Sequence, residues 1–223
     1  TIEVDTPAGT VGAVDVVATV GAESATETNG WTYTSAVTYA ELDPSRKGAD
    51  VTIKVDNVSA INQSANNALA QHVASDALGS TGKVYAEIEI VETSGVGGTI
   101  SVGVSNGSAD PATDWGGIDA NSIAYWNSGF WTGGSRINSA PTFVDADIIG
   151  VALDTATGEV WFSRNGSFFG DPVAGTGEAA TLSGSAWHLI IGPWAINTEA
   201  KIVTDPADMT YSAPTGFTAG WPT

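Results

Sequence analysis

Three carboxylates in one short stretch are well suited to catalysis by their type and spacing. The stretch reads Glu87-Ile-Glu89-Ile-Val-Glu92, and on a strand Glu87 and Glu89 would lie on the same face. Retaining glycosidases use two carboxyl groups about 5 Å apart, one as the nucleophile and one as the acid/base. The competing interpretation is structural, with Glu87 fixed within a strand and Glu89 and Glu92 at solvated positions.

The other acids and the histidines give weaker patterns. His72 and His188 have no His or Cys partner at metal-ligand spacing, so both are expected to be ordinary surface or interface residues. Asp110, Asp114 and Asp119 share one loop that could hold Ca²⁺, but their spacing matches no calcium-loop motif and favours solvation of the loop. The sequence has no Cys, which excludes disulfides and thiolate chemistry. We therefore expect no metal and no cofactor.

Residues 115–136 combine aromatic rings with polar side chains. Both members of the pairs 125–126 and 130–131 are aromatic, and neighbours on a strand face opposite sides, so some rings must lie outside the core. Exposed rings beside polar groups suit recognition of a sugar or a protein surface. The competing interpretation is that the rings cap the open end of a sandwich. The candidate ligand-binding residues are Trp115, Asp119, Trp126, Asn127, Phe130, Trp131 and Arg136.

The composition indicates a folded, strongly acidic chain of many short strands. Of 223 residues, 42% are hydrophobic and 14% are charged, and the 27 glycines suit tight turns. The 7 Lys and Arg against 25 Asp and Glu give a formal net charge of −18. This charge argues against binding to nucleic acid or to anionic membrane surfaces. No apolar window of about 18 residues is present, so membrane insertion is not expected.

A hairpin signature lies in residues 147–166, which read DIIGVALDTATGEVWFSRNG. Two apolar or aromatic runs joined by a short polar turn with Gly predict a β-hairpin. The run D-[IV]-I-G-V-A-L-D, a turn, and an aromatic strand ending in S-[KR]-N-G resembles the core signature of SPRY domains. The resemblance implies an all-β fold, an antiparallel β-sandwich of the concanavalin or jelly-roll type. It also implies binding of partners through loops, without catalysis.

Further motifs extend the resemblance over residues 37–220. In chain order they are GKVYAEIEI at 82–90, ISVGVS at 100–105, SIAY at 122–125, GDP at 170–172, Trp187, and YSAPTGF at 211–217. Ala124 and Ala213 stand where the family usually has Gly and Pro. The ending at 211–217 is similar to that of the bacterial and bacteriophage branch of the family.

Two units are expected, residues 1–36 and residues 37–223. The first should contain strands at Val14–Val20 and Asn29–Thr34. Its order of motifs resembles the C-terminal part of an immunoglobulin-like IPT/TIG domain, although an N-terminal extension packed on the main domain is the alternative. In the second unit, residues 43–48 predict a turn and Val51–Val55 a strand. Residues 60–77 have helical spacing of apolar residues but are rich in Asn and Ser, so strands are favoured.

The two resemblances together imply a bacteriophage virion protein. In such proteins these domains tip tail fibres or decorate capsids, at the virion surface, and serve host attachment. The expected function is non-enzymatic recognition of host-surface glycans or proteins, or of neighbouring virion proteins. Assembly into a homo-oligomer is compatible with this function. One alternative is a carbohydrate-binding module of a bacterial secreted or cell-surface protein. Another is a laminarinase-type glycoside hydrolase, with Glu87 as nucleophile and Glu92 as acid/base.

Overall fold

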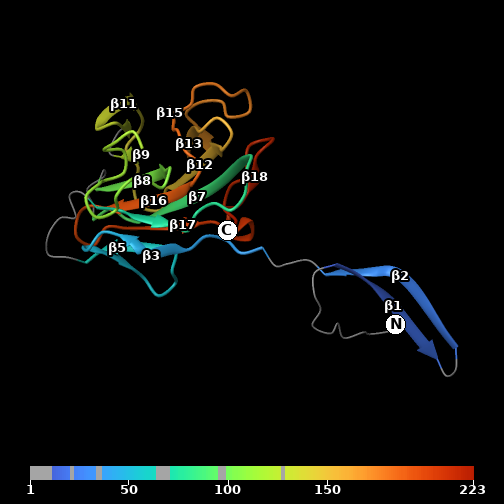
Figure 1. Ribbon diagram of the computed structural model, residues 1–223. Coiled ribbons are helices and arrows are strands. Elements are labelled where there is room, and N and C mark those ends of the chain that lie inside the picture. The colour runs from blue at the N-terminus through green and yellow to red at the C-terminus, as the bar shows by residue number, and fades with distance from the viewer. Residues whose placement is uncertain (1–11, 21–22, 34–36, 64–70, 95–98, 127–128) are drawn as a thin grey trace. The chain divides into compact units, whose positions relative to one another are not determined.

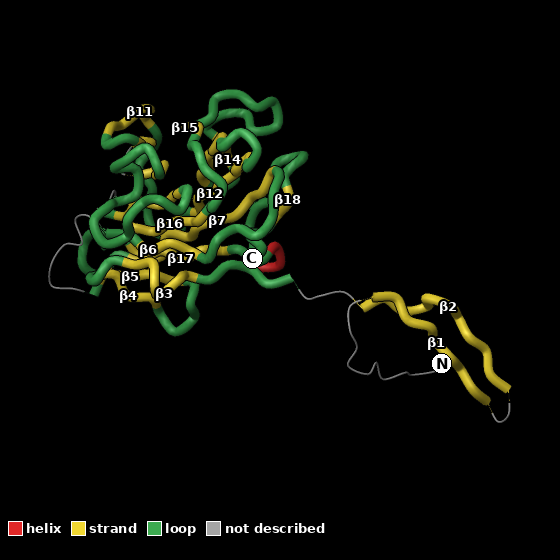
Figure 2. Tube along the Cα trace, viewed as in Figure 1, coloured by secondary structure: helices red, strands yellow, loops and turns green. Residues whose placement is uncertain are grey.

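The structure is a computed structural model that describes residues 12–20, 23–33, 37–63, 71–94, 99–126 and 129–223. The chain divides into two compact units, Thr1–Thr38 and Tyr39–Thr223 (Figure 1). Strands and loops make up almost all of the described chain, and a short 3₁₀ helix lies near its C-terminal end (Figure 2). The predicted all-β class is confirmed.

The first unit contains one antiparallel hairpin. Strand β1 (Gly12–Val20) pairs with β2 (Glu23–Tyr33), with an irregularity in register between Val14 and Val16. Both expected strands are present, and each is longer than the sequence indicated. The likeness to an IPT/TIG domain stays a prediction.

The second unit is a sandwich of two sheets. One has seven antiparallel strands, in the order β11 (Ser135–Ser139), β10 (Gly129–Thr132), β9 (Ser122–Trp126), β8 (Ile100–Ser105), β16 (His188–Pro193), β6 (Val73–Ser75) and β3 (Leu42–Lys47). We call it the seven-stranded sheet. The order places residues of the β9–β10 hairpin near one edge and β3 at the other (Figure 1).

The other sheet has nine strands. Its main path is β14 (Ser167–Phe168), β13 (Glu159–Arg164), β12 (Ile148–Asp154), β7 (Lys83–Glu92), β17 (Glu199–Val203), β5 (Ser59–Asn62) and β4 (Val51–Ile53). Two short strands complete it, because β15 (Ala180–Thr181) pairs with β13, and β18 (Thr218–Ala219) runs parallel to β7. We call it the nine-stranded sheet.

The hairpin predicted within residues 147–166 lies inside this sheet and is buried on both faces. β12 pairs with β13 on one side and with β7 on the other. Val151 and Leu153 belong to the main core between the sheets, whereas Ala152 and Trp161 belong to a second apolar cluster. Strands covered on both faces need apolar residues at nearly every position, which is the observed pattern.

Polar residues of the hairpin signature connect the start of β12 to the end of β13 through hydrogen bonds. Asp147 is 4% exposed, and its carboxylate accepts hydrogen bonds from Arg164 Nε at 2.8 Å, Asn165 Nδ2 at 2.7 Å and the Val144 amide at 2.7 Å. The charge is thereby paired as well as hydrogen-bonded, as a buried carboxylate requires. Gly150 of β12 has no room for a side chain, since an added Cβ would lie 2.2 Å from Ser163 Oγ.

The C-terminal segment, residues 205–221, covers the outer face of the nine-stranded sheet. It begins with the 3₁₀ helix η1 (Pro206–Asp208), drawn in red in Figure 2. Phe217 then packs edge-on against Trp161, with ring centroids 6.1 Å apart. Tyr85, Ala152, Trp161 and Phe217 thus form the second apolar cluster.

Of two expectations for residues 43–77, the structure contradicts one and confirms the other. The turn predicted at residues 43–48 is wrong, because Leu42–Lys47 form strand β3. An edge strand tolerates Pro44, and the register between Leu42 and Lys47 is shifted as in a bulge. The preference for strands over a helix is confirmed by β5 and β6, whereas residues 64–70 lie outside the described residues.

Candidate functional site

Four tryptophans meet on the outer face of the seven-stranded sheet. Trp126 lies at the end of β9, Trp131 on β10, Trp115 in the connection between β8 and β9, and Trp194 directly after β16. From Trp126, the ring centroids of Trp115, Trp131 and Trp194 lie 4.9, 5.1 and 4.8 Å away. All four side chains are half-buried. We call this group the tryptophan cluster.

Strand alternation separates these rings from the aromatic core. Trp126 and Trp131 face outward, whereas their neighbours Tyr125 and Phe130 are buried, the latter 4% exposed. Phe130 stacks on Phe162 of the other sheet at 5.2 Å. Burial raises the pKa of Tyr125 to about 12. Phe130 therefore lies in the core and supports the outer rings from beneath.

Trp194 is the member that sequence reasoning missed. It stacks on Trp126 with an interplanar angle of 29°, and its carbonyl accepts a hydrogen bond from Asn62 Nδ2 at 2.7 Å. The sequence offers one local indication of this position, because Trp194 directly follows the apolar run 189–192 and Pro193. No periodicity links Trp194 to the aromatic segment, because only the pairing of β16 with β8 brings the two together.

Trp115 is carried by the connection between β8 and β9, residues 106–121, which we call the covering loop. The loop passes over small residues of the sheet. An added Cβ at Gly116 would lie 2.9 Å from Ile190 Cδ1 and 3.1 Å from Ala124 Cβ. This close approach gives a reason for Ala124, in a position where a larger side chain would push the loop away.

Polar residues border the tryptophan cluster. Arg136 of β11 is exposed and lies opposite Trp131 in the register of the hairpin. The Asp119 carboxylate is half-buried and accepts hydrogen bonds from the amide and the side chain of Asn121 at 2.9 and 2.7 Å. Asn127 lies outside the described residues. The roles of these side chains in ligand binding stay predictions.

Glu87 has the structural role. It is fully buried, and its carboxylate accepts hydrogen bonds from the Thr210 and Tyr211 amides, both at 2.7 Å, and from Tyr85 Oη at 3.0 Å. The C-terminal segment thus closes Glu87 off from any substrate. Glu92 is half-buried and accepts a bond from the Ser94 amide. The arrangement does not support a pair of glycosidase carboxylates here.

The expectation that both histidines are ordinary surface or interface residues is wrong, because both are buried within the second unit. His72 is 0% and His188 5% exposed, both in the seven-stranded sheet or directly before it. Their ring Nδ1 atoms lie 2.5 Å from Asp114 O and 2.7 Å from Ser75 O. Burial lowers the pKa of both imidazoles. Sequence spacing carried no sign of this, because the loop that covers His72 comes from elsewhere in the chain.

The acidic loop is organised by its own backbone. Asp110 Oδ1 accepts from the Ala112 amide, and Asp114 Oδ2 from the Asp110 amide, at 2.9 and 2.8 Å. Among the described residues, no three His, Cys, Asp or Glu side chains are grouped so as to hold a metal ion. In the same part of the chain, no helix is long and apolar enough to cross a membrane.

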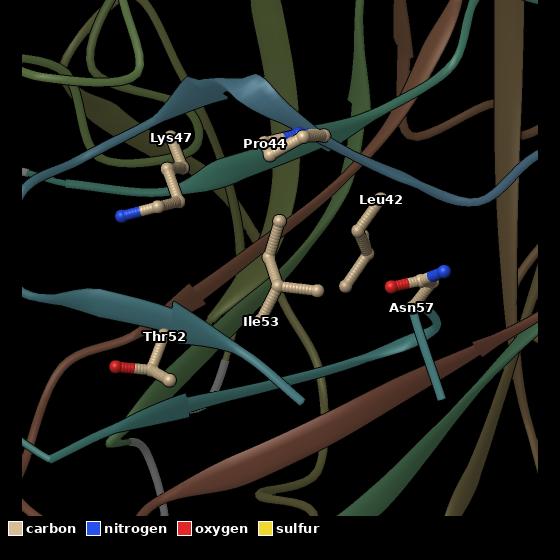
Figure 3. Close-up of a pocket in the computed structure, with 6 residues that line it drawn as sticks. All are labelled: Leu42, Pro44, Lys47, Thr52, Ile53 and Asn57. Carbon is tan, nitrogen blue, oxygen red and sulfur yellow. The ribbon is translucent and has the colours of Figure 1, made fainter. Parts of the chain in front are cut away.

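A slot of about 310 Å³ lies between the edge strands β3 and β4, which belong to opposite sheets (Figure 3). Ile53 points into its middle, with Lys47 toward one end and Asn57 toward the other (Figure 3). Two hydrogen bonds connect its two sides, from Leu42 N to Asn57 O and from Lys47 Nζ to Val51 O. The residues that line the slot include no aromatic side chain, in contrast to the tryptophan cluster.

Comparison with known proteins agrees with this architecture. The SPRY domain family matches residues 83–179. Among solved structures, the SPRY domain of human HERC1 superposes with a TM-score of 0.56 at 15% identity, covering 77% of this chain and 99% of that one. The TRIM65 PSpry domain gives 0.55 at 14% identity, covering 75% and 93%. Stonustoxin gives 0.53 at 17% identity, covering 74% of this chain and 27% of that one.

These identities are low, so the solved structures establish the fold and nothing more specific. No curated protein sequence matches the chain. The family match includes β7 to β13 and the hydrogen bonds around Asp147. Residues 83–179 are therefore a SPRY domain, set within a two-sheet antiparallel sandwich of the SPRY fold.

Proposed function

We propose that this protein is a non-catalytic recognition module that binds its ligand on the tryptophan cluster. SPRY domains are generally modules that recognise proteins or other ligands. The observation that carries the proposal is the presence of four half-buried indoles on the outer face of a sheet. Large rings left partly in water at one place usually mark a contact surface.

The ligand class that suits this surface is a glycan. One face of many sugar rings presents C–H groups that pack on an indole, and the hydroxyls at the ring edge need hydrogen-bonding partners. Trp131 and Trp126 would supply the platform, and Asp119 and Arg136 the polar border. The net charge of −18 disfavours polyanions such as nucleic acids as ligands.

The setting we propose is the surface of a bacteriophage virion, as part of a tail-fibre adhesin or a capsid decoration protein. The support is the resemblance of residues 211–217 to the phage and bacterial branch of the family, together with the resemblance of residues 1–36 to an IPT/TIG domain. Host-surface glycans or neighbouring virion proteins would be the partners, and self-association would fit a fibre. A carbohydrate-binding module of a bacterial secreted or surface protein is the alternative. Detection of the protein on purified virions would favour the first setting over the second.

Binding to a glycan array, followed by titration of the strongest glycan, tests the proposal. Trp131→Ala should weaken binding tenfold or more, because loss of about 1.4 kcal/mol corresponds to that factor. Trp131→Phe, which keeps a ring, should retain most of the affinity. Val173→Ala, at a residue 57% exposed in another loop, is the matched control and should bind normally.

Two results would contradict the proposal. One is normal glycan binding by a folded Trp131→Ala variant, with folding judged by an unchanged circular dichroism spectrum and a cooperative melt. The other is hydrolysis of a β-glucan by the wild-type protein that Glu87→Gln abolishes, which would restore the glycosidase alternative.

A further inference from the structure

His72 ties the covering loop to the seven-stranded sheet. Its amide donates to Pro111 O at 3.1 Å, its ring Nδ1 lies 2.5 Å from Asp114 O, and its own carbonyl accepts from the Gly48 amide at 2.9 Å. The side chain is 0% exposed. One residue outside the loop therefore binds the loop twice, at residues 111 and 114.

The second of these contacts is adjacent to the tryptophan cluster. Trp115 follows Asp114 directly, and its ring lies 4.9 Å from Trp126 and 5.6 Å from Trp131, centroid to centroid. Trp115 reaches these two rings from the covering loop and not from a strand. The position of its ring thus depends on how firmly residues 111–114 are held.

The buried surroundings of the ring, and not the contact with Asp114 O itself, favour the neutral imidazole. Because a carbonyl oxygen can only accept, Nδ1 carries the hydrogen and donates the hydrogen bond to Asp114 O. Nε2 is buried and has no hydrogen-bond partner among the described residues. Burial lowers the pKa of His72, and Arg46 adds to this, whereas Asp114 and Asp110 act in the opposite direction. A proton on Nε2 would bury a charge and an unpaired donor together.

We propose that His72 is the positioning residue for Trp115, and that protonation of its ring releases the covering loop and so weakens the tryptophan cluster at acidic pH. The inference rests on the proposed function for its consequence in ligand binding. The release itself is a property of the unliganded protein, and it can be measured without any ligand.

The direction of the pH effect follows from linkage. With the loop open, the ring is solvated and its pKa is about 6.5. With the loop closed, the pKa lies below that value. The closed state therefore has its full stability above pH 6.5 and loses it as the pH falls. Between pH 7.5 and 5.0 the ratio of open to closed loop should rise by up to about 30-fold.

Hydrogen exchange of the unliganded protein tests this. The reporting amides are those of Asp114, Gly117 and Ile118, which are bonded to Asp110 O, Ser122 Oγ and Trp115 O. Their protection factors, corrected for the intrinsic dependence of exchange on pH, should fall about tenfold or more from pH 7.5 to 5.0. The amide of Val151 in the core hairpin is the internal reference and should not change.

Three variants separate positioning from general destabilisation. His72→Asn keeps a donor at the place of Nδ1 but cannot be protonated, so its loop should stay protected at both pH values. His72→Ala should leave the loop unprotected at both. His188→Asn, at a buried histidine bonded to Ser75 O instead of the loop, should keep the wild-type response of the loop to pH.

Equal protection of the wild-type loop amides at pH 7.5 and 5.0 would overturn the proposal. So would a fall in His72→Asn as large as in the wild type. Glycan binding that is absent at every pH would contradict the proposed function and leave this exchange result standing. If the protection of the loop amides does not depend on pH while glycan binding is normal, the positioning role of His72 is contradicted and the proposed function is not.

Discussion

At the scale of single residues, two tryptophans on the outer faces of the two sheets have different surroundings. Trp161 faces outward from the nine-stranded sheet, but the C-terminal segment covers it and leaves it 0% exposed. Trp131 faces outward from the seven-stranded sheet and is half-buried among other indoles. The first ring is therefore part of a buried apolar cluster, whereas the second keeps part of its surface in contact with solvent.

Replacement of Trp161 by Ala should lower the free energy of unfolding by about 3–5 kcal/mol, as expected for loss of a large buried ring. The variant also loses the hydrogen bond from Trp161 Nε1 to Thr176 O, which measures 3.1 Å. Urea unfolding measures the change, with Val144→Ala at a 53% exposed residue as control. An unchanged midpoint for Trp161→Ala would show that the ring is not part of the core.

At the scale of elements, the hairpin signature consists of residues that join strands. Asp147 fixes the end of β13 through Arg164, and Asp154 begins the turn between β12 and β13 by accepting a bond from the Ala156 amide at 3.0 Å. Gly158 ends that turn with φ of +77°. Asp147, Asp154 and Arg164 of the signature thus have structural roles in the turn and in the hydrogen bonds that connect the strands.

Gly158→Ala should be strongly destabilising. The added Cβ would lie 1.8 Å from Leu182 O, in a backbone conformation that already disfavours a side chain. Gly175→Ala is the matched control, because Gly175 has φ of +67° but no atom within 4 Å of its added Cβ. The control should show only the conformational penalty of roughly 1–2 kcal/mol. Similar melting temperatures for the two variants would contradict the predicted clash.

Glu87→Gln should loosen the C-terminal segment. The carboxylate accepts from two amides and a hydroxyl, and the amide group of Gln would set its own donor against one of those donors. The expected loss is about 1–3 kcal/mol, together with faster hydrogen exchange at Thr210 and Tyr211. Glu89→Gln, on the same strand and half-buried, is the control. If both variants exchange alike, Glu87 does not anchor the segment.

At the scale of the whole molecule, the chain comprises two units whose internal contacts are separate. The second unit holds its own ends together. Tyr39 forms a bridge with Pro222, and the Ala40 amide donates to Trp221 O at 2.9 Å. The SPRY fold can therefore close without residues 1–36.

Deletion of residues 1–36 should leave the remainder folded, with a single cooperative transition in calorimetry and an unchanged near-ultraviolet circular dichroism spectrum. The physical reason is that residues 39–40 and 221–222, which close the sandwich, are retained. Loss of the cooperative transition would mean that the chain folds as one unit and that the predicted boundary is wrong.

The sequence alone determined the class of fold and its central strands. Two apolar runs around a polar turn placed β12 and β13 correctly. The resemblance of residues 82–90, 100–105 and 122–125 to SPRY motifs placed β7, β8 and β9. Alternation also required that some of the rings at 125–131 lie outside the core, and the structure assigns Trp126 and Trp131 to that side. These are properties of neighbours along the chain.

Only the tertiary structure decided what covers each face. It buried His72 and His188, made a strand of the segment containing Pro44, closed Glu87 beneath residues 210–211, and added Trp194 to the cluster. Each of these outcomes depends on a contact between segments far apart in the sequence. Spacing along the chain cannot report such contacts, because the burial of a side chain is set by whichever segment packs over it.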